Sequence, residues 1–253
     1  MKALITGASS GIGRDMAYYL ANLGYDLILV ARRKERLEEI KEKVKTNVQI
    51  LVLDLLKEEN VFKLHEQVKK ENIDILINNA GFGLFGMFSK TDLTRELEMI
   101  DLNIKAYHIL TKLFLIDFIK KDNGYILNVC SSAGFLVGPR LNTYYATKNY
   151  ITKLTMGIYE ELKHQNSHVH ISCLCPGPVA TEFNSVAHGV FSLKEMPSRK
   201  VAKYAIDRMF KNKLIIVPGF SVKLGLFFNR IIPWKLSMAI TYKIQKRKYP
   251  EEK

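Results

Sequence analysis

A glycine-rich segment near the N-terminus separates a short apolar run from a longer apolar-periodic segment. The run covers residues 2–5, the glycine-rich segment reads Thr6-Gly7-Ala8-Ser9-Ser10-Gly11-Ile12-Gly13, and the periodic segment covers residues 16–23. This order predicts a strand that turns sharply into a helix. Glycines in such a turn let backbone N–H groups approach a pyrophosphate, because no Cβ stands in the way. The segment therefore predicts a dinucleotide-binding turn.

Strand and helix patterns alternate along the rest of the chain. We expect strands at residues 2–6, 27–31, 48–53, 73–78, 124–131, 168–175 and 213–217. Several are near-continuous runs of Ile, Leu and Val, which is typical of strands buried on both faces. The alternation predicts an α/β fold, a single-domain Rossmann-like doubly wound parallel sheet of about seven strands with helices on both faces. We expect one catalytic domain at 1–220, holding the cofactor and substrate sites together, and a C-terminal extension at 221–253.

The C-terminal segment carries much of the formal net charge of +13. From Val222 to Lys248 it contains seven Lys and Arg residues and no acidic residue, interleaved with aliphatic and aromatic residues and broken at Pro233. We expect this basic amphipathic segment to pack on the domain or on a neighbouring subunit, with peripheral contact to an anionic membrane surface as the alternative. Nucleic-acid binding is not expected, because no helix-turn-helix, zinc or aromatic-basic sheet pattern accompanies the charge.

The sequence shows no targeting pattern and no cysteine pattern of a metal site or disulfide framework. The first apolar run ends at Gly7, which is too short for a signal peptide, and no stretch reaches membrane-spanning length, so we expect a cytoplasmic protein. Cys130, Cys173 and Cys175 lack the spacing of a metal site or a disulfide framework. They are expected to be buried apolar residues, with no metal bound.

Polar residues follow several of the expected strands, where open parallel sheets place their ligand sites. They occur in the motifs Asn78-Asn79-Ala80-Gly81, Ser131-Ser132-Ala133-Gly134 and Pro176-Gly177-Pro178-Val179-Ala180-Thr181. Tyr144 and Lys148 lie four residues apart at the start of a helix, a spacing that puts both on one face. The ammonium is expected to lower the pKa of the phenol, so that Tyr144 can exchange a proton near neutral pH.

As a set, these motifs resemble the short-chain dehydrogenase/reductase family from residue 2 to about residue 217, in both order and separation. The resemblance implies hydride transfer between a nicotinamide and a carbonyl or secondary alcohol carbon. It implies that Tyr144 is the general acid or base, that Ser131 orients the substrate oxygen, and that Lys148 holds the nicotinamide ribose and tunes Tyr144. Asn103 would hold a water in a proton relay. A homodimer or homotetramer is implied as well.

The same resemblance implies a set of cofactor contacts. These are Gly7, Ser9, Ser10, Gly11, Ile12, Gly13, Asp54, Leu55, Asn79, Ala80, Gly81, Tyr144, Lys148, Pro176, Gly177, Val179 and Thr181.

Two neighbouring residues compete with the assigned pair, and spacing favours the assignment. Only Tyr144 has a lysine at i+4, since Tyr145 has Asn149 there. Ser132 is either a helper of Ser131 or a turn residue. For Asn103 the alternative is a buried side chain bonded to backbone carbonyls.

The end of the second expected strand favours NADP(H) over NAD(H). It reads Ala31-Arg32-Arg33 without an acidic residue, and Asp26 lies at the opposite end of the strand. A basic side chain there can bind a ribose 2′-phosphate, and the Ser9 hydroxyl can add a hydrogen bond to the same phosphate. We expect Arg32 to be the main contact, with Arg33 either a second contact or a helix-surface charge.

The segment after the Pro-Gly turn contains the apolar residues Phe183, Val186, Val190, Phe191 and Leu193. We expect a lipophilic ketone, aldehyde or acyl-derived substrate. The alternative function is a catalytically silent NADP-binding sensor or scaffold on the same fold. The complete set of Asn103, Ser131, Tyr144 and Lys148 favours the enzyme, because a sensor needs no group that transfers protons.

Overall fold

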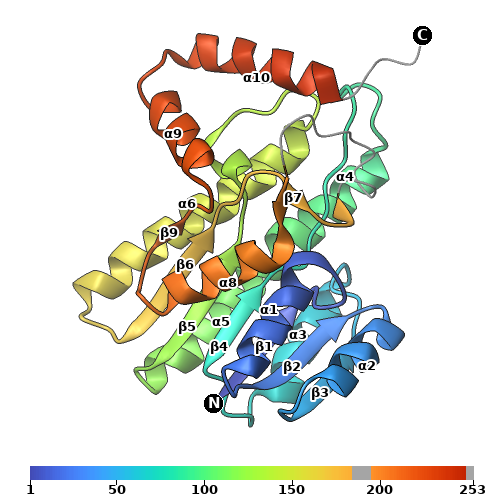
Figure 1. Ribbon diagram of the computed structural model, residues 1–253, viewed down its shortest axis with the longest axis vertical. Helices are drawn as coiled ribbons and strands as arrows, with labels where there is room; N and C mark the ends of the chain where they lie inside the picture. The colour runs from blue at the N-terminus through green and yellow to red at the C-terminus, as the bar shows by residue number, and fades with distance from the viewer. Residues whose placement is uncertain (184–194, 249–253) are drawn as a thin grey trace.

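A seven-stranded parallel sheet lies at the centre of the computed structural model, which describes residues 1–183 and 195–248 (Figure 1). Its strands are β1 (Lys2–Thr6), β2 (Asp26–Ala31), β3 (Val48–Val52), β4 (Ile75–Asn78), β5 (Gly124–Val129), β6 (Val169–Leu174) and β9 (Ile215–Ile216). They are ordered β3-β2-β1-β4-β5-β6-β9. The predicted doubly wound α/β fold is confirmed. The chain order reverses direction between β1 and β4.

Helices connect the strands and cover both faces of the sheet (Figure 1). They are α1 (Gly11–Asn22), α2 (Lys34–Lys43), α3 (Glu58–Val68), α4 (Leu93–Ile100), a π-helical segment (Asp101–Ala106), α5 (Tyr107–Lys120), a short 3-10 helix (Ser132–Phe135), α6 (Asn142–His164), α8 (Ser198–Met209), α9 (Phe220–Asn229) and α10 (Trp234–Lys248).

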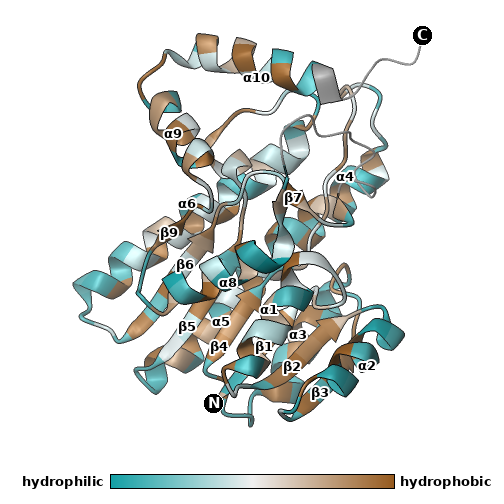
Figure 2. Ribbon diagram, in the orientation of Figure 1, coloured by the Kyte–Doolittle hydropathy of each residue, from teal (hydrophilic) through white to brown (hydrophobic). Residues whose placement is uncertain are grey.

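Alternate residues of each strand enter two separate cores. In β1, Ala3 and Ile5 belong to the core beneath α1 and α8, whereas Leu4 belongs to the core beneath α3 and α5. Successive side chains of a strand point to opposite faces, so a strand covered on both sides must be apolar throughout. Figure 2 shows these strands as hydrophobic ribbons beneath helices of mixed polarity. This double burial explains the unbroken Ile, Leu and Val runs.

A second, two-stranded sheet was not expected from the sequence. It pairs β7 (Val179–Ala180) with β8 (Met196–Pro197) in parallel. In the sequence, the predicted apolar pocket residues Val186, Val190, Phe191 and Leu193 come after β7 and before β8, and they fall outside the described residues.

The helices α9 and α10 follow the last strand of the sheet and lie at the end of the molecule opposite the N-terminus (Figure 1). The predicted break at Pro233 falls between them. Within residues 1–183 and 195–248, no helix combines the length and apolar character needed to span a membrane.

Candidate active site

A cleft of about 460 Å³ opens at the carboxyl ends of the strands, beside the point where strand order reverses. Ligands of open α/β sheets bind at this place, and the volume suits a small-molecule site. Its lining brings together most of the predicted residues: Gly7, Ser9, Ser10, Gly11, Ile12, Arg32, Arg33, Asp54, Leu55, Asn79, Ala80, Gly81, Ser131, Tyr144, Lys148, Pro176, Gly177, Val179 and Thr181. Gly13 and Asn103 lie behind this lining and support it.

The glycine turn is packed directly against the loop that follows β4. Gly7 has φ +62°, and a Cβ there would lie 2.7 Å from the Cα of Ala80. A Cβ on Gly13 would lie 2.4 Å from Nδ2 of Asn79. That amide donates to the carbonyls of Thr6 (3.1 Å) and Gly7 (3.0 Å). Asn79 therefore holds the turn in shape, in addition to lining the cleft.

This turn fits the pyrophosphate of a dinucleotide. Gly11 has φ +55° and begins α1, and Ser10 before it makes no side-chain capping bond. The first N–H groups of the helix lack that capping bond and carry the positive end of its dipole. Asp54 and Leu55 line the cleft beyond β3. The chain thus offers a backbone cradle for a pyrophosphate, and side chains on its glycines would collide with Asn79, Ala80 or Thr181.

Arg32, the expected main contact, and Arg33 both line the cleft, but the side-chain hydrogen bonds there are made by Arg33. Its guanidinium donates to Oγ of Ser9 (3.3 and 3.1 Å) and pairs with Glu182 at 2.8 Å. Arg36 also pairs with Glu182. In the described part of the chain, the Arg32 side chain makes no such bond. The backbone is extended at Arg33 (φ −92°, ψ 94°), and successive residues of extended backbone point to opposite sides.

Ser131, Tyr144 and Lys148 converge at the inner end of the cleft. Ser131 follows β5, and its side chain lowers the pKa of the Tyr144 phenol, whereas the backbone N–H of Ser132 donates to the carbonyl of Pro176 at 2.8 Å. Tyr144 and Lys148 lie one turn apart in the first half of α6. Spacing in the sequence selects the same serine and tyrosine whose side chains interact here.

Burial dominates the protonation of the pair in α6. It raises the pKa of Tyr144 above its ordinary value of 10, although the hydrogen bond from Ser131 opposes it. It also lowers the pKa of Lys148 to about 8. Nζ of Lys148 donates to the Val129 carbonyl (2.9 Å) and lies 5.8 Å from the centre of the Tyr144 ring. The prediction that Lys148 lowers the pKa of Tyr144 is therefore wrong for the protein alone, because desolvation outweighs the distant ammonium.

Asn103 is fully buried in the π-helical segment before α5. Its Nδ2 donates to the carbonyl of Phe82 (2.9 Å) and to Oγ1 of Thr147 (3.2 Å), and its Oδ1 accepts from the N–H of Phe82 (3.2 Å). A Cβ on Gly81 would lie 2.8 Å from that Oδ1 and 3.7 Å from Nζ of Lys148. Asn103 thus binds the backbone after β4 to α6, immediately behind Lys148. These contacts match the alternative of a buried side chain bonded to backbone.

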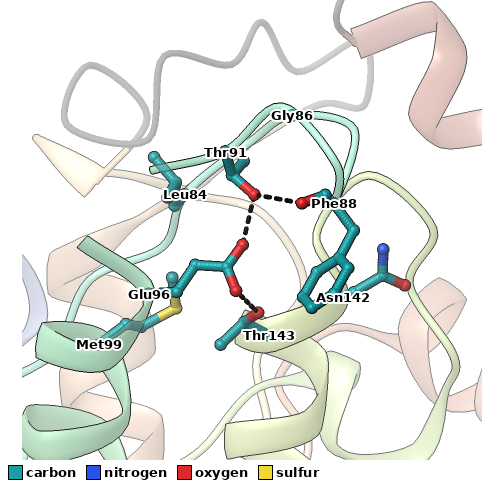
Figure 3. Close-up of a pocket in the computed structure, with 8 residues that line it drawn as sticks. All are labelled: Leu84, Gly86, Phe88, Thr91, Glu96, Met99, Asn142 and Thr143. Atoms are coloured by element: carbon teal, nitrogen blue, oxygen red, sulfur yellow. Dashed lines mark hydrogen bonds between the residues drawn. The ribbon is translucent and has the colours of Figure 1, made fainter. Parts of the chain in front are cut away.

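A buried carboxylate fixes the beginning of α6 from the other side. Glu96 of α4 accepts hydrogen bonds from the hydroxyls of Thr91 and Thr143, the latter at 3.0 Å (Figure 3). Thr143 lies in the first turn of α6 and directly precedes Tyr144. The negative charge is favourable at a helix N-terminus. Sequence reasoning missed Glu96, because its partners are brought to it only by the tertiary fold.

Apolar and aromatic side chains form the wall beside Tyr144. Phe85, Leu141, Tyr145 and Phe183 pack together there, and the Phe183 and Tyr144 ring centres are 5.3 Å apart. Gln245 of α10 also lines the cleft and donates to the Tyr145 hydroxyl at 2.5 Å. The apolar character predicted from Phe183 extends over this wall. The participation of Tyr145 and Gln245 was not predicted.

Comparison with known proteins agrees with this architecture. The profile of the short chain dehydrogenase family matches residues 1–188. The NADP-dependent 3-hydroxy acid dehydrogenase YdfG of Escherichia coli is 32% identical over 191 residues, covering 74% of this chain and 76% of that protein. These two sequence matches show to which family the chain belongs.

Solved structures give the same result. A short-chain dehydrogenase from Sphingobium yanoikuyae in complex with NADPH has a TM-score of 0.82 and 26% identity, covering 100% of this chain and 98% of that chain. The bulky-bulky ketone specific alcohol dehydrogenase from Comamonas testosteroni has a TM-score of 0.79 and 25% identity, covering 100% and 96%. One structural neighbour was solved with NADPH and another with NAD. The chain belongs to the short-chain dehydrogenase/reductase family and is an oxidoreductase.

Proposed function

We propose that the protein is an NADPH-dependent reductase of a lipophilic ketone, aldehyde or acyl-derived carbonyl compound. The observation that carries the proposal is that Ser131, Tyr144 and Lys148 line one cleft with the glycine turn, beside an apolar wall. A carbonyl oxygen placed between the two hydroxyls would bring its substituents against Phe183 and Leu141. Such a wall favours apolar groups over small charged oxo acids.

Tyr144 donates the proton to the carbonyl oxygen in this proposal, and Ser131 orients that oxygen. The raised pKa of Tyr144 keeps its hydroxyl protonated near neutral pH, which suits a general acid in the direction of reduction. The Lys148 ammonium stabilises negative charge that develops on the phenol oxygen during transfer, and it holds the nicotinamide ribose. When bound, NADPH supplies the hydride.

Arg33 and Ser9 select NADPH over NADH in this proposal. The Arg33 guanidinium already lies against the Ser9 hydroxyl at the mouth of the nucleotide turn. A guanidinium forms paired hydrogen bonds with a phosphate, whereas a ribose 2′-hydroxyl alone would leave much of its charge uncompensated. Asn103 keeps its proposed place in a proton relay by holding a water beyond Lys148. We also propose a homodimer or homotetramer.

The proposal is tested by following oxidation of NADPH, and separately of NADH, with a panel of alkyl ketones, aryl ketones, aldehydes, 3-oxoacyl thioesters and small oxo acids. We expect turnover of lipophilic carbonyl compounds with NADPH, and a loss of kcat of roughly a hundredfold or more in Tyr144→Phe. Tyr145→Phe is the matched control and should retain most of the activity. Reduction of small oxo acids alone would refute the substrate class. Retained activity in Tyr144→Phe would refute the assigned acid.

A further inference from the structure

The two C-terminal helices expose an apolar surface that the fold leaves uncovered in the described structure. Phe220 is 79% exposed, Ile231 65% and Trp234 67%. We call this the tail surface, and it comprises the exposed apolar residues Phe220, Leu224, Phe227, Phe228, Ile231, Trp234, Leu236, Ile240 and Ile244 with the exposed cations Lys223, Arg230, Lys235, Lys243 and Lys246. Single exposed apolar residues are ordinary on a protein surface, but a contiguous group on neighbouring helices indicates an interaction site.

Helical spacing separates this surface from the side of each helix that contacts the domain. In α10, Leu236, Ile240 and Ile244 recur every four residues and are exposed. Thr241 and Gln245 lie about a third of a turn away around that helix and are buried. In α9, the stripe of Phe220, Leu224, Phe227 and Phe228 is exposed, whereas Val222 and Leu226 pack on the core around Cys130 and Cys173. Both helices are therefore anchored along one side and carry a free apolar stripe along another.

The charge of the tail surface selects its partner. Residues 222–248 carry seven basic residues and no acidic residue. A two-fold dimer formed through this surface would set these cations against an identical set, and a second copy carries a net charge of +13 as a whole. A partner must therefore combine an apolar interior with negative charge at its boundary. An anionic lipid bilayer has both.

We propose that the tail surface binds the interface of an anionic membrane, with α9 and α10 lying in the plane of the bilayer. Phenylalanine, tryptophan and isoleucine side chains would enter the boundary between headgroups and acyl chains, while the lysine and arginine side chains reach the anionic headgroups. No described helix is long and apolar enough to cross the bilayer, and this mode of binding requires none.

The position of the tail next to the cleft adds a consequence that rests on the proposed function. Gln245 of α10 lines the cleft, and Val222 of α9 lies against Gly177, where a Cβ would be 2.7 Å from its methyl group. Membrane binding through the exposed sides of these helices would hold the cleft near the lipid, where a lipophilic carbonyl compound accumulates. The binding itself does not depend on turnover, so the two proposals can fail separately.

Flotation of the full chain with vesicles tests the binding. We compare vesicles of phosphatidylcholine with vesicles of equal parts phosphatidylcholine and phosphatidylglycerol, at low and high salt. We expect binding to the anionic vesicles that weakens as salt rises, because exposed charges are screened. The variant Ile231→Ser/Trp234→Ser should lower the bound fraction about tenfold, since two exposed anchors are removed. Leu23→Ser/Phe62→Ser removes two exposed apolar side chains away from the tail surface, one directly after α1 and one in α3, and should bind as the unmodified protein does.

Equal thermal stability of the two double variants will show that folding is not the cause of any loss. The proposal is overturned if the unmodified protein does not float with the anionic vesicles, or if both double variants float equally. It is also overturned if light scattering shows that Ile231→Ser/Trp234→Ser dissociates an oligomer while vesicle binding is unaltered, because the surface would then bind a second copy. NADPH oxidation with a water-soluble ketone, measured without vesicles, tests the proposed function independently.

Discussion

Replacing Lys148 by methionine should abolish activity and make the protein more stable at neutral pH. The Lys148 ammonium is almost fully buried, with 4% of its surface exposed. Burial disfavours its charged form and lowers its pKa from 10.5 to about 8. At pH 7 the folded protein holds this charge at a cost that the unfolded chain does not have.

The size of the gain follows from the two pKa values. One pH unit corresponds to about 1.4 kcal/mol, so the difference between 10.5 and about 8 makes the buried charge unfavourable by about 3 kcal/mol. Methionine loses the ammonium's contact with the Tyr107 ring, at 5.1 Å, and its bond to the Val129 carbonyl. That carbonyl still accepts from the Tyr107 hydroxyl at 3.2 Å, so the loss is about 1 kcal/mol. We expect Lys148→Met to be more stable by about 2 kcal/mol.

The gain has a definite pH dependence. Between pH 8 and 10.5 the unfolded chain binds more protons at Lys148 than the folded protein does, so the stability of the unmodified protein rises with pH in this window. The advantage of the variant is full below about pH 8 and disappears towards pH 10.5. Buried tyrosines with raised pKa values affect both proteins alike and cancel in the difference.

Urea unfolding of the nucleotide-free protein across this pH range measures the effect. Lys153→Met, at an exposed position of the same helix, is the control and should show no comparable gain. A Lys148→Met protein that is less stable than the unmodified one at pH 7 would refute the reasoning. So would a difference that stays constant with pH, because a packing effect alone does not titrate.

Three further predictions concern the cleft and its supports. Gly13→Ala should lower the free energy of unfolding by roughly 1–3 kcal/mol and weaken nucleotide binding, because the new Cβ meets Asn79. Gly157→Ala is the control: its Cβ would have no neighbouring atom within 4 Å, so the free energy of unfolding should rise by roughly 0.5–1 kcal/mol. Urea titration compares the two. Arg33→Ala should raise KM for NADPH about tenfold or more with little change for NADH, and Arg32→Ala much less; equal effects of both substitutions would contradict the assignment. Glu96→Ala should lower kcat and stability together, by about 2 kcal/mol in unfolding, and Glu96→Gln should recover most of both, because the amide oxygen accepts from one threonine hydroxyl and the amide N–H donates to the other. Thermal unfolding and kcat measured on the same samples decide this.

The fold could be predicted because burial on both faces leaves a clear pattern in the strands. The predicted third strand, 48–53, became Val48–Val52, and the sixth, 168–175, became Val169–Leu174. The last strand was predicted at 213–217 and comprises Ile215–Ile216. Periodicity identifies the apolar run but not the residues whose backbone hydrogen bonds close the ladder. The sheet of β7 and β8 was missed because two-residue strands have no period to detect.

The candidate site also has a part that could be predicted from the sequence and a part that could not. Tyr144 and Lys148 could be paired from the sequence because they share one helix, where a separation of four residues fixes their relation. Glu96 and Thr143 are 47 residues apart, and Tyr145 and Gln245 are 100 apart. No local rule relates such positions, and each contact exists only because separate elements pack together. The pKa of Tyr144 was misjudged for a related reason, since desolvation depends on the whole surrounding fold.

The two arginines after β2 are alike in residue type and differ in their place in the backbone. Both side chains have the chemistry to bind a phosphate, and composition cannot separate them. Arg33 lies in extended backbone immediately before α2, and its side chain is turned towards Ser9. Glu182, 149 residues further on, then pairs with the same guanidinium. If Arg33 binds the 2′-phosphate as proposed, that phosphate would compete with Glu182 for the guanidinium.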